Sequence, residues 1–519
     1  MFEPAAACFM GWERKRGKIA EFNRLLRGAV DTTFTRVTAP TQLLARIRYV
    51  ITLDTDTELP LGVARRLVAA IAHPLNRPWL DERRQRVRRG HAIIQPRVGT
   101  SPMSARQSAF ARLAAGPPGI DPYTTAVSDV YQDLFGQGSF VGKGIYEVDA
   151  FEAATRGRFP TNQLLSHDLI ESIYARAALA SDIEVLDEQP AAYSVAAGRN
   201  HRWMRGDWQL LPWLWPRVPA QTGTRRFDFS WFDAWRVVDN LRRSLLSPAL
   251  VVLATVSWLS GFGTALVGSL LLLAVFVVPV VGRLVFAFAR ADSQLDWLGG
   301  LGGDLKTNAQ QAFLSLTFLL DQALVSADAI VRANYRQFVS RRGMLEWTSM
   351  RDAARRSGNS VLRVPRLLAG STLSLGILGA VGWCAPRAVV FAGPVLLLWA
   401  SSPWVSVWVS RVQPSGVAQP WGAQELRAFR RVARKTWRFF ERFVGDLDHH
   451  LPPDNFQEDP RGVVAHRTSP TNIGLYLLSV GSARDLAFIP LDEAMQRWDR
   501  TLTTIERLEK REGHVLNWY

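Results

Sequence analysis

The chain has 519 residues, 48% of them hydrophobic, and a net charge of +16, so we expect two or three domains and anionic partners. Its only cysteines, Cys8 and Cys384, exclude a disulfide framework and a thiolate metal site. The first ten residues lack the basic start and the cleavage site of a secretory signal.

The first elements predicted along the chain are a basic helix within residues 11–30 and a strand over residues 49–53, which leads into Asp54-Thr55-Asp56. Ligands of open α/β sheets bind in the crevice at the carboxyl ends of the strands. Two carboxylates this close need a positive partner, and a divalent cation that carries a diphosphate would supply it. A strand followed by a plain acidic turn is the alternative.

Strands and helices alternate up to about residue 220, which predicts an α/β domain. We expect a helix over residues 64–72, a strand over 92–98 and a strand over 183–186. The charge run at 83–89 indicates a solvated loop, and residues 160–180 open with a turn and become a helix. Few residues precede the first acidic strand, so we expect the first strands of this domain to be missing from the chain.

A glycine-rich stretch at residues 136–144 contains Gly138, Ser139 and Gly142-Lys143-Gly144. It is not a phosphate-binding P-loop, because Gly144 stands where that motif needs Ser or Thr. A strand edge that lets a substrate approach the backbone and a simple bulged strand are both open interpretations.

Asp168 opens a helix directly after Ser166-His167. It either completes a helix start, where Ser166 caps and an acid is favoured, or acts as a general base on an acceptor hydroxyl. Arg202 and Trp203 follow in a later helix. A fixed cation there could stabilise a departing diphosphate and an indole could stack on a sugar, although an Arg–Trp belt near a membrane is equally open.

Long uncharged runs dominate the middle of the chain. Residues 244–282 hold no charge for 39 positions, and residues 367–386 and 388–410 add runs of 20 and 23. These lengths predict four transmembrane helices in two hairpins. Basic residues flank the spans, so the soluble parts are expected on the cytoplasmic side. Residues 313–330 contain Asp321 and Asp328 and are better interpreted as an interfacial helix.

The order of these motifs resembles that of processive inverting glycosyltransferases of the cellulose, chitin and hyaluronan synthase kind. Their pattern is Asp-x-Asp, then Thr/Ser-Glu-Asp, then Gln-x-x-Arg-Trp. Here Ser166-His167-Asp168 and Arg199-Asn200-His201-Arg202-Trp203 keep the catalytic Asp and the Arg-Trp pair but not the Glu or the Gln.

A closer resemblance, to cyclic β-1,2-glucan synthases, covers nearly all 519 residues. The segments that carry it are Lys15-Arg16-Gly17-Lys18 with Phe22-Asn23, residues 138–146, residues 202–209, residues 451–457 and residues 466–474. The resemblance implies a fragment of a larger enzyme: a GT-A-like (Rossmann-like) glycosyltransferase domain at 1–220, an interfacial linker at 221–243, a transmembrane hairpin at 244–282, a cytoplasmic loop with an interfacial helix at 283–366, a second hairpin at 367–410, and the beginning of an all-α, glucoamylase-like (α/α-barrel) domain at 421–519.

The resemblance also implies transfer of glucose from UDP-glucose to a growing β-1,2-glucan at the inner face of the plasma membrane. In that scheme Asp54 and Asp56 hold Mg²⁺ or Mn²⁺, Asp168 is the base, and Arg202 and Trp203 bind the leaving group and the acceptor. Gly138 and Ser139 edge the acceptor site. Any role of Asp454, Glu458 and Asp459 rests on the resemblance alone.

The alternative is a non-catalytic anchoring or translocation module of a larger polysaccharide synthase, since the donor pocket is incomplete and the membrane segments are prominent. Nucleic-acid binding is not expected, because the positive charge follows the membrane ends and no recognition motif occurs. The expected partners are UDP-glucose, a glucan acceptor, the lipid bilayer and the remaining domains of the synthase.

Overall fold

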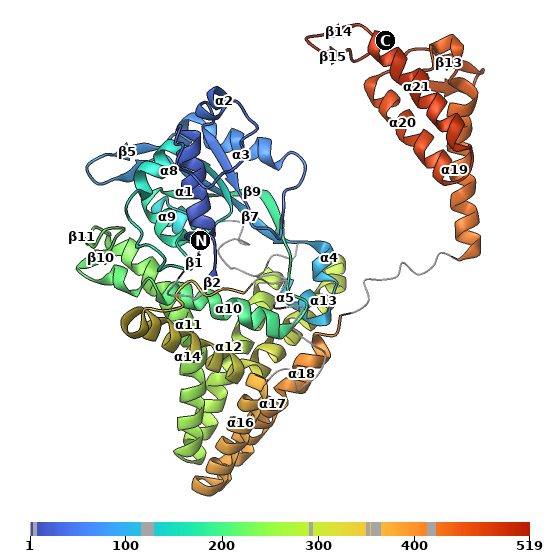
Figure 1. The fold of residues 1–519 in the computed structure, drawn as a ribbon. Helices are drawn as coiled ribbons and strands as arrows, with labels where there is room; N and C mark the ends of the chain where they lie inside the picture. Colours follow the sequence, from blue (N-terminus) through green and yellow to red (C-terminus); the bar gives the residue numbers. More distant parts are fainter. Residues whose placement is uncertain are drawn as a thin grey trace. The chain divides into compact units, whose positions relative to one another are not determined.

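A computed structural model describes residues 2–3, 8–115, 129–289, 294–348, 353, 365–412 and 422–519 (Figure 1). The chain divides into two compact units, Met1–Ser415 and Gly416–Tyr519. Their boundary falls between the predicted second hairpin, which ends at residue 410, and the predicted C-terminal domain, which starts at residue 421. The predicted loop 283–366 is described in part, since residues 290–293, 349–352 and 354–364 lie outside the described ranges.

The first unit contains a mixed five-stranded sheet with the strand order β3-β8-β7-β9-β4. Only β7 and β9 are parallel; β3 and β7 both pair antiparallel with β8, and β4 pairs antiparallel with β9. The strands are β3 (Tyr49–Thr52), β4 (Thr57–Glu58), β7 (Ile93–Thr100), β8 (Gly144–Glu147) and β9 (Ala177–Asp187).

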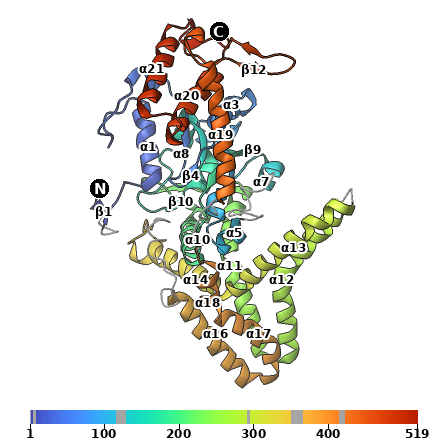
Figure 2. The same cartoon turned by 90° about the vertical axis from the view of Figure 1, so that its right-hand side faces the viewer.

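Helices cover both faces of this sheet, so the architecture is a mixed α/β one, as expected (Figures 1 and 2). Val63, Leu67 and Ile71 of α3 (Val63–Ala72) pack on one face against Ile94 and its neighbours. The other face is covered by three helices: α1 (Arg14–Leu26), α8 (Val148–Thr155) and α9 (Asp168–Tyr174). Since β3 ends at Thr52 and α9 begins at Asp168, both acidic motifs lie at element ends, where side chains can face a ligand.

Two predicted elements were wrong. Arg86–Arg89 is strand β6 and pairs with β5 (Trp79–Asp81), because the turn between them closes a hairpin that buries Val87. Residues 177–180 are not helical: α9 ends at Tyr174, and β9 begins at Ala177 and pairs with β7. The apolar residues of β9 gain more from burial in the sheet than from their helical propensity.

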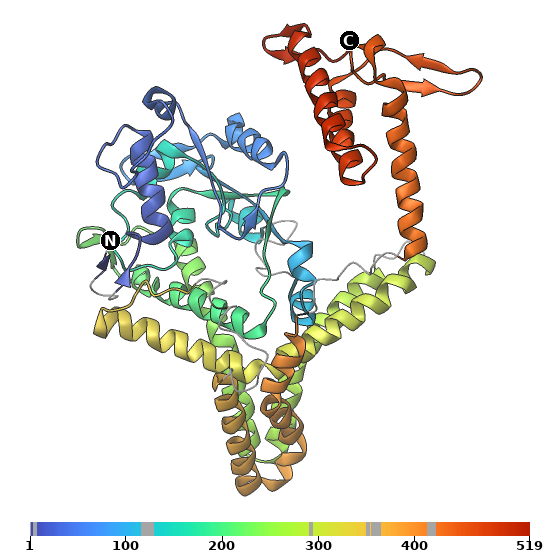
Figure 3. The same ribbon diagram turned by 45° about the vertical axis from the view of Figure 1, so that its right-hand side comes forward.

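A bundle of long helices follows the α/β layers (Figures 2 and 3). Its main helices are α10 (Tyr193–Trp208), α11 (Trp231–Leu259), α12 (Phe262–Ala289), α13 (Gln294–Thr317), α14 (Leu319–Tyr335), α16 (Pro365–Cys384), α17 (Val389–Ala400) and α18 (Ser402–Val409). Cluster residues such as Trp258, Leu272, Val381 and Trp399 form an apolar core between α11, α12, α16 and α17.

Among the described residues, two helices are long and apolar enough to cross a membrane, Phe262–Gly282 and Pro365–Cys384. The number rises to four if each of two bent pairs is one span: Leu305–Thr317 with Leu319–Ser340, bent by 55°, and Pro386–Ala400 with Ser402–Val409, bent by 47°. The segment 313–330, predicted as an interfacial helix, lies across the first of these bends.

A buried carboxylate, Asp321, ties three helices of the bundle together. Arg366 at the start of α16 donates from Nε and Nη2 to Asp321 of α14, at 2.8 and 3.1 Å. The hydroxyl of Tyr193, the first residue of α10, donates to the same carboxylate at 2.7 Å. Asp321 is only 2% exposed, and these three donors satisfy its charge.

The second unit is mainly helical, as expected for 421–519. It contains α19 (Ala423–Phe443), α20 (Pro470–Asp485) and α21 (Leu491–Arg507), whose apolar faces meet around Trp437, Tyr476 and Val480. Two short hairpins complete it: β12 (Asn455–Gln457) with β13 (Val463–Ala465), and β14 (Lys510–Arg511) with β15 (His514–Val515).

The remaining elements are short connectors. They are β1 (Phe2–Glu3), β2 (Cys8–Phe9), α2 (Thr41–Ala45), η1 (Pro74–Asn76), α4 (Pro102–Ala105), α5 (Ala109–Ala115), α7 (Val130–Phe135), η2 (Leu211–Leu214), β10 (Arg217–Pro219), β11 (Thr224–Arg226), η3 (Arg336–Ser340), η5 (Pro386–Ala388) and η6 (Asp446–Asp448).

Candidate active site

Asp54 lies at the end of β3 and is held by two lysines from distant parts of the chain. Nζ of Lys15, on α1, lies 2.6 Å from Oδ1, and Nζ of Lys143 lies 3.2 Å from Oδ2. Lys143 also forms an ion pair with Asp187 at the end of β9. Burial alone would raise the pKa of Asp54, but the charges of Lys15 and Lys143 outweigh it and hold the pKa below its usual value.

Gly142 brings the backbone of the glycine-rich stretch against Asp168. Its carbonyl oxygen accepts a hydrogen bond from Lys15 Nζ at 2.7 Å. Its φ is +82°, and a Cβ at this position would lie 3.0 Å from Oδ1 of Asp168. Glycine therefore suits this position, because it tolerates the positive φ and leaves room for the Asp168 carboxylate. Lys15 and Gly142 thus link the two acidic motifs, Asp54 and Asp168, into one site.

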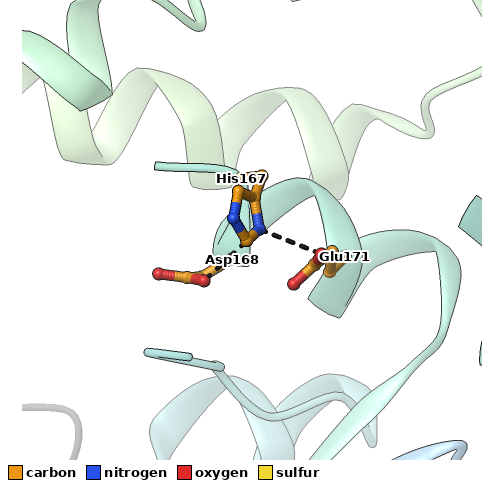
Figure 4. Close-up of side chains that lie close together, drawn as sticks. All are labelled: His167, Asp168 and Glu171. Atoms are coloured by element: carbon orange, nitrogen blue, oxygen red, sulfur yellow. Dashed lines mark ion pairs between the residues drawn. The ribbon is translucent and has the colours of Figure 1, made fainter. Parts of the chain in front are cut away.

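Asp168 belongs to a compact group with His167 and Glu171 at the start of α9 (Figure 4). Nδ1 of His167 lies 2.9 Å from Oε1 of Glu171 and 3.6 Å from Oδ1 of Asp168. Asp168 is the most open member, with a side chain that is 26% exposed, whereas that of Glu171 is 4% exposed.

The charge states of this group depend on one another. Burial raises the pKa of Asp168, and the charge of Glu171 raises it further, while His167 and Lys15 partly oppose both. Burial lowers the pKa of His167, but the carboxylates of Glu171 and Asp168 outweigh it and raise the pKa. A partly exposed carboxylate with a raised pKa is suited to accept a proton.

Asp56 faces the arginines of α10. Its charge acts on both Arg199 and Arg202 and partly offsets the burial that lowers their pKa values, that of Arg199 to about 10. Asp187 acts on Arg199 in the same way. The structure therefore brings the predicted residues Asp54, Asp56, Asp168 and Arg202 into one neighbourhood of alternating charge.

The Arg-Trp pair points in two directions. Arg202 donates from Nη1 to the carbonyl of Thr348, and its guanidinium lies 5.4 Å from the ring centre of Trp347. Trp203, the next residue, is 46% exposed, and the guanidinium of Arg199 lies 4.8 Å from its ring centre. The exposed ring leaves an apolar surface free to stack on a sugar.

Gly138 and Ser139, the predicted edge of the acceptor site, are anchored on the side of β9 and α11. The amide of Ser139 donates to Oδ2 of Asp129 at 2.8 Å, and the carbonyl of Gly138 accepts from Nη2 of Arg236 at 3.0 Å. Among the described residues, the glycine that contacts the acidic motifs is Gly142, four positions further on.

Of the two predicted metal ligands, Asp56 is open to a divalent cation and Asp54 is not. Within the described ranges Asp56 forms no ion pair, so its oxygens are available to a hard cation. Both oxygens of Asp54 are occupied by lysines, so Asp54 can join a metal ion only after Lys15 or Lys143 turns away. The same lysines are ready counter-charges for a diphosphate.

Sequence reasoning missed five charged members of this site: Lys15, Lys143, Glu171, Asp187 and Arg199. Lys143 follows Gly142 directly, and a lysine in a glycine-rich turn was a usable signal. Lys15 stood in one of the segments that carry the family resemblance, but neither it nor Asp187 showed a site role, because these roles depend on the packing of α1 and on the antiparallel pairing of β4 with β9.

No family model matches the chain. Over 525 aligned residues, the chain is 40% identical to the cyclic beta-(1,2)-glucan synthase NdvB of Rhizobium meliloti (strain 1021). The match covers all of this chain but only 18% of that protein. The resemblance carried by the motifs is confirmed: over its whole length this chain is similar to a segment of a cyclic glucan synthase.

Proposed function

We propose that this chain forms the glucosyltransferase centre of a membrane-bound cyclic β-1,2-glucan synthase, with UDP-glucose as the donor and a growing glucan as the acceptor. The observation that supports this most strongly is the junction of Asp54 and Asp168 through Lys15 and the Gly142 carbonyl. Two carboxylates in different environments, with cations between them, suit a reaction of this kind. One carboxylate can accept a proton, and the cations can neutralise the charge of a diphosphate.

In the proposed reaction the carboxylate of Asp168 takes the proton of the acceptor 2-hydroxyl. The acceptor oxygen then forms a bond to C1 of glucose while the bond between C1 and the diphosphate oxygen breaks, so that an α-linked donor gives a β product. The lysines at Asp54 and the α10 arginines Arg199 and Arg202 face the departing negative charge. Trp203 offers its exposed ring to the acceptor, and Gly138 and Ser139 edge the acceptor site in this proposal.

Mg²⁺ or Mn²⁺ is proposed on Asp56, with Asp54 as a second ligand once a lysine moves. When bound, such an ion would neutralise the diphosphate. The apolar helices support a membrane location for the chain. We place the α/β layers at the cytoplasmic face of the inner membrane, since basic residues flank the apolar segments.

The decisive experiment replaces Asp168 with Asn in the full-length synthase and measures incorporation of radiolabelled glucose into glucan by membranes. We expect a loss of about a hundredfold or more, with UDP-glucose binding retained, because loss of general-base catalysis typically costs at least this much. Unchanged glucan output would favour the non-catalytic anchoring role, in which the transfer centre lies elsewhere in the larger protein.

A further inference from the structure

The group at the start of α9 contains an ion pair and also has the composition of a metal site. His167, Asp168 and Glu171 each offer one ligand atom, and these three atoms all lie within 4.8 Å of one another (Figure 4). One imidazole nitrogen and two carboxylates form a mixed donor set that suits Zn²⁺ and neighbouring divalent transition metals better than Mg²⁺.

The buried imidazole is the second observation. His167 is 7% exposed, and its Nδ1 forms an ion pair with Oε1 of Glu171 at 2.9 Å but no hydrogen bond of good geometry in the part of the chain that the structure describes. A buried ring nitrogen of this kind normally has a partner. A metal ion between Nδ1 and the two carboxylates would satisfy it.

Space and charge at this position agree with a bound ion. A cavity of about 10 Å³, close to the least space that one water molecule needs, is lined by all three residues. Around one Zn²⁺, ligand atoms at about 2.0–2.2 Å from the metal are roughly 3–4 Å apart, near the 2.9 and 3.6 Å separations of Nδ1 from the carboxylates. The two cations that act on the group, Lys15 and Arg16, are each paired with another carboxylate, Asp54 and Glu13.

We propose that His167, Asp168 and Glu171 bind one divalent transition metal ion of the Zn²⁺ type, at a site separate from Asp54 and Asp56. A metal ion there occupies the carboxylate of Asp168, the proposed base, so metal binding inhibits the transfer reaction. This consequence rests on the proposed function, whereas the binding itself does not. The glucan synthase is therefore expected to lose activity when Zn²⁺ is added in the presence of excess Mg²⁺ or Mn²⁺.

Binding is tested first, without substrate, on the purified full-length synthase in detergent. Zn²⁺ binding is measured by competition with a chromophoric chelator for the wild type and for the variants His167→Gln and Glu171→Gln. Each substitution should weaken binding at one site by more than about tenfold, since even the loss of outer-shell support costs this much. The control is His466→Gln, which removes an exposed imidazole that is also 2.8 Å from a carboxylate, that of Asp448.

Circular dichroism spectra establish that each variant is folded. Because two ligand residues are replaced separately, the test still holds if one of the two variants does not fold. Equal Zn²⁺ affinity in the wild type, His167→Gln and Glu171→Gln would overturn the proposal, as would an equal loss in His466→Gln. Zn²⁺ inhibition of glucan synthesis is then compared between the wild type and Glu171→Gln. One further outcome is that the variants lose Zn²⁺ binding but Zn²⁺ does not inhibit glucan synthesis by the wild type. This outcome would support the metal site and count against Asp168 as the base.

Discussion

Nζ of Lys15 donates a hydrogen bond to Oδ1 of Asp54 across 2.6 Å, although the two residues belong to a helix and to the end of a strand. The same ammonium group bonds to the Gly142 carbonyl, and its charge acts on Asp168. One lysine therefore influences both the proposed metal site and the proposed base.

Replacing Lys15 with Met should shift the acid limb of the pH–rate profile of glucan synthesis to higher pH. The base must be ionised, so activity falls as the pH drops through the pKa of Asp168. That pKa is already raised by burial, and loss of the Lys15 charge, which lowers it, raises it further. The profile is measured as kcat/KM between pH 5 and 8.

The control is Lys18→Met, which removes a lysine three residues further along α1 whose partner is Glu21 and whose side chain is 57% exposed. Its acid limb should match that of the wild type. An unchanged limb in Lys15→Met would show that Lys15 does not act on the base.

Gly142→Ala should reduce glucan synthesis clearly while the protein still folds, because the new Cβ displaces the Asp168 carboxylate. The new Cβ would lie 3.0 Å from Oδ1 of Asp168 and would also face an unfavourable positive φ of 82°. Gly157→Ala is the matched control, because Gly157 has φ +71° but its nearest atom lies 4.0 Å away, on Gln221. Both variants should lose roughly 1 kcal/mol or somewhat more of stability. If both variants retain full activity, the close fit between Gly142 and Asp168 is not needed for catalysis.

The α/β class and the neighbourhood of Asp54 and Asp168 followed from the sequence, because a strand that ends in acids and a helix that opens with one both point to the ligand-binding edge of a sheet. The mixed strand order did not, since β8 pairs antiparallel with both β3 and β7. Antiparallel pairing depends on chain reversal through residues far apart, which local pattern does not encode.

The finer placement of the site was less predictable. Gly138 and Gly142 look equivalent in the sequence, yet only Gly142 has the positive φ and the close approach to Asp168. His167 replaces the Glu of the related motif, and Glu171, one turn later, restores a buried carboxylate beside it. Spacing on a helix makes this compensation visible once the helix is known to start at Asp168.

Arg86→Met should destabilise the first unit by about 3 kcal/mol. Arg86 of β6 makes a bidentate pair with Asp233 of α11, at 2.7 and 2.9 Å, and the Asp233 side chain is 0% exposed. Loss of the arginine leaves a buried carboxylate without its paired cation, its remaining partners among the described residues being the amide and the hydroxyl of Ser230. Arg88→Met is the control on the same strand: its pair with Asp81 is 3.7 Å long and half-exposed, so it should cost less than about 1 kcal/mol.

Denaturant unfolding of the purified protein in detergent, followed by tryptophan fluorescence, measures both changes. Equal losses in the two variants would mean that the β6–α11 pair contributes no more than a surface contact. A double variant, Arg86→Met with Asp233→Leu, should lose less than the sum of its parts, because the buried charge is removed as well.

Acid should weaken the native state through His91. Burial, with the charge of Arg176, lowers the pKa of His91 to about 4, against 6.5 for an unperturbed imidazole. Between these values the unfolded chain binds a proton that the native state does not, so this contribution is fully present above pH 6.5 and is lost as the pH falls towards 4. The loss between pH 7 and pH 5 should be about 2 kcal/mol.

Thermal unfolding of the wild type and of His91→Gln at both pH values measures this loss, and His91→Gln should lose clearly less stability on acidification. His73→Gln, at an exposed position, should keep the wild-type dependence, so that the same difference in all three proteins would exclude His91 as the cause.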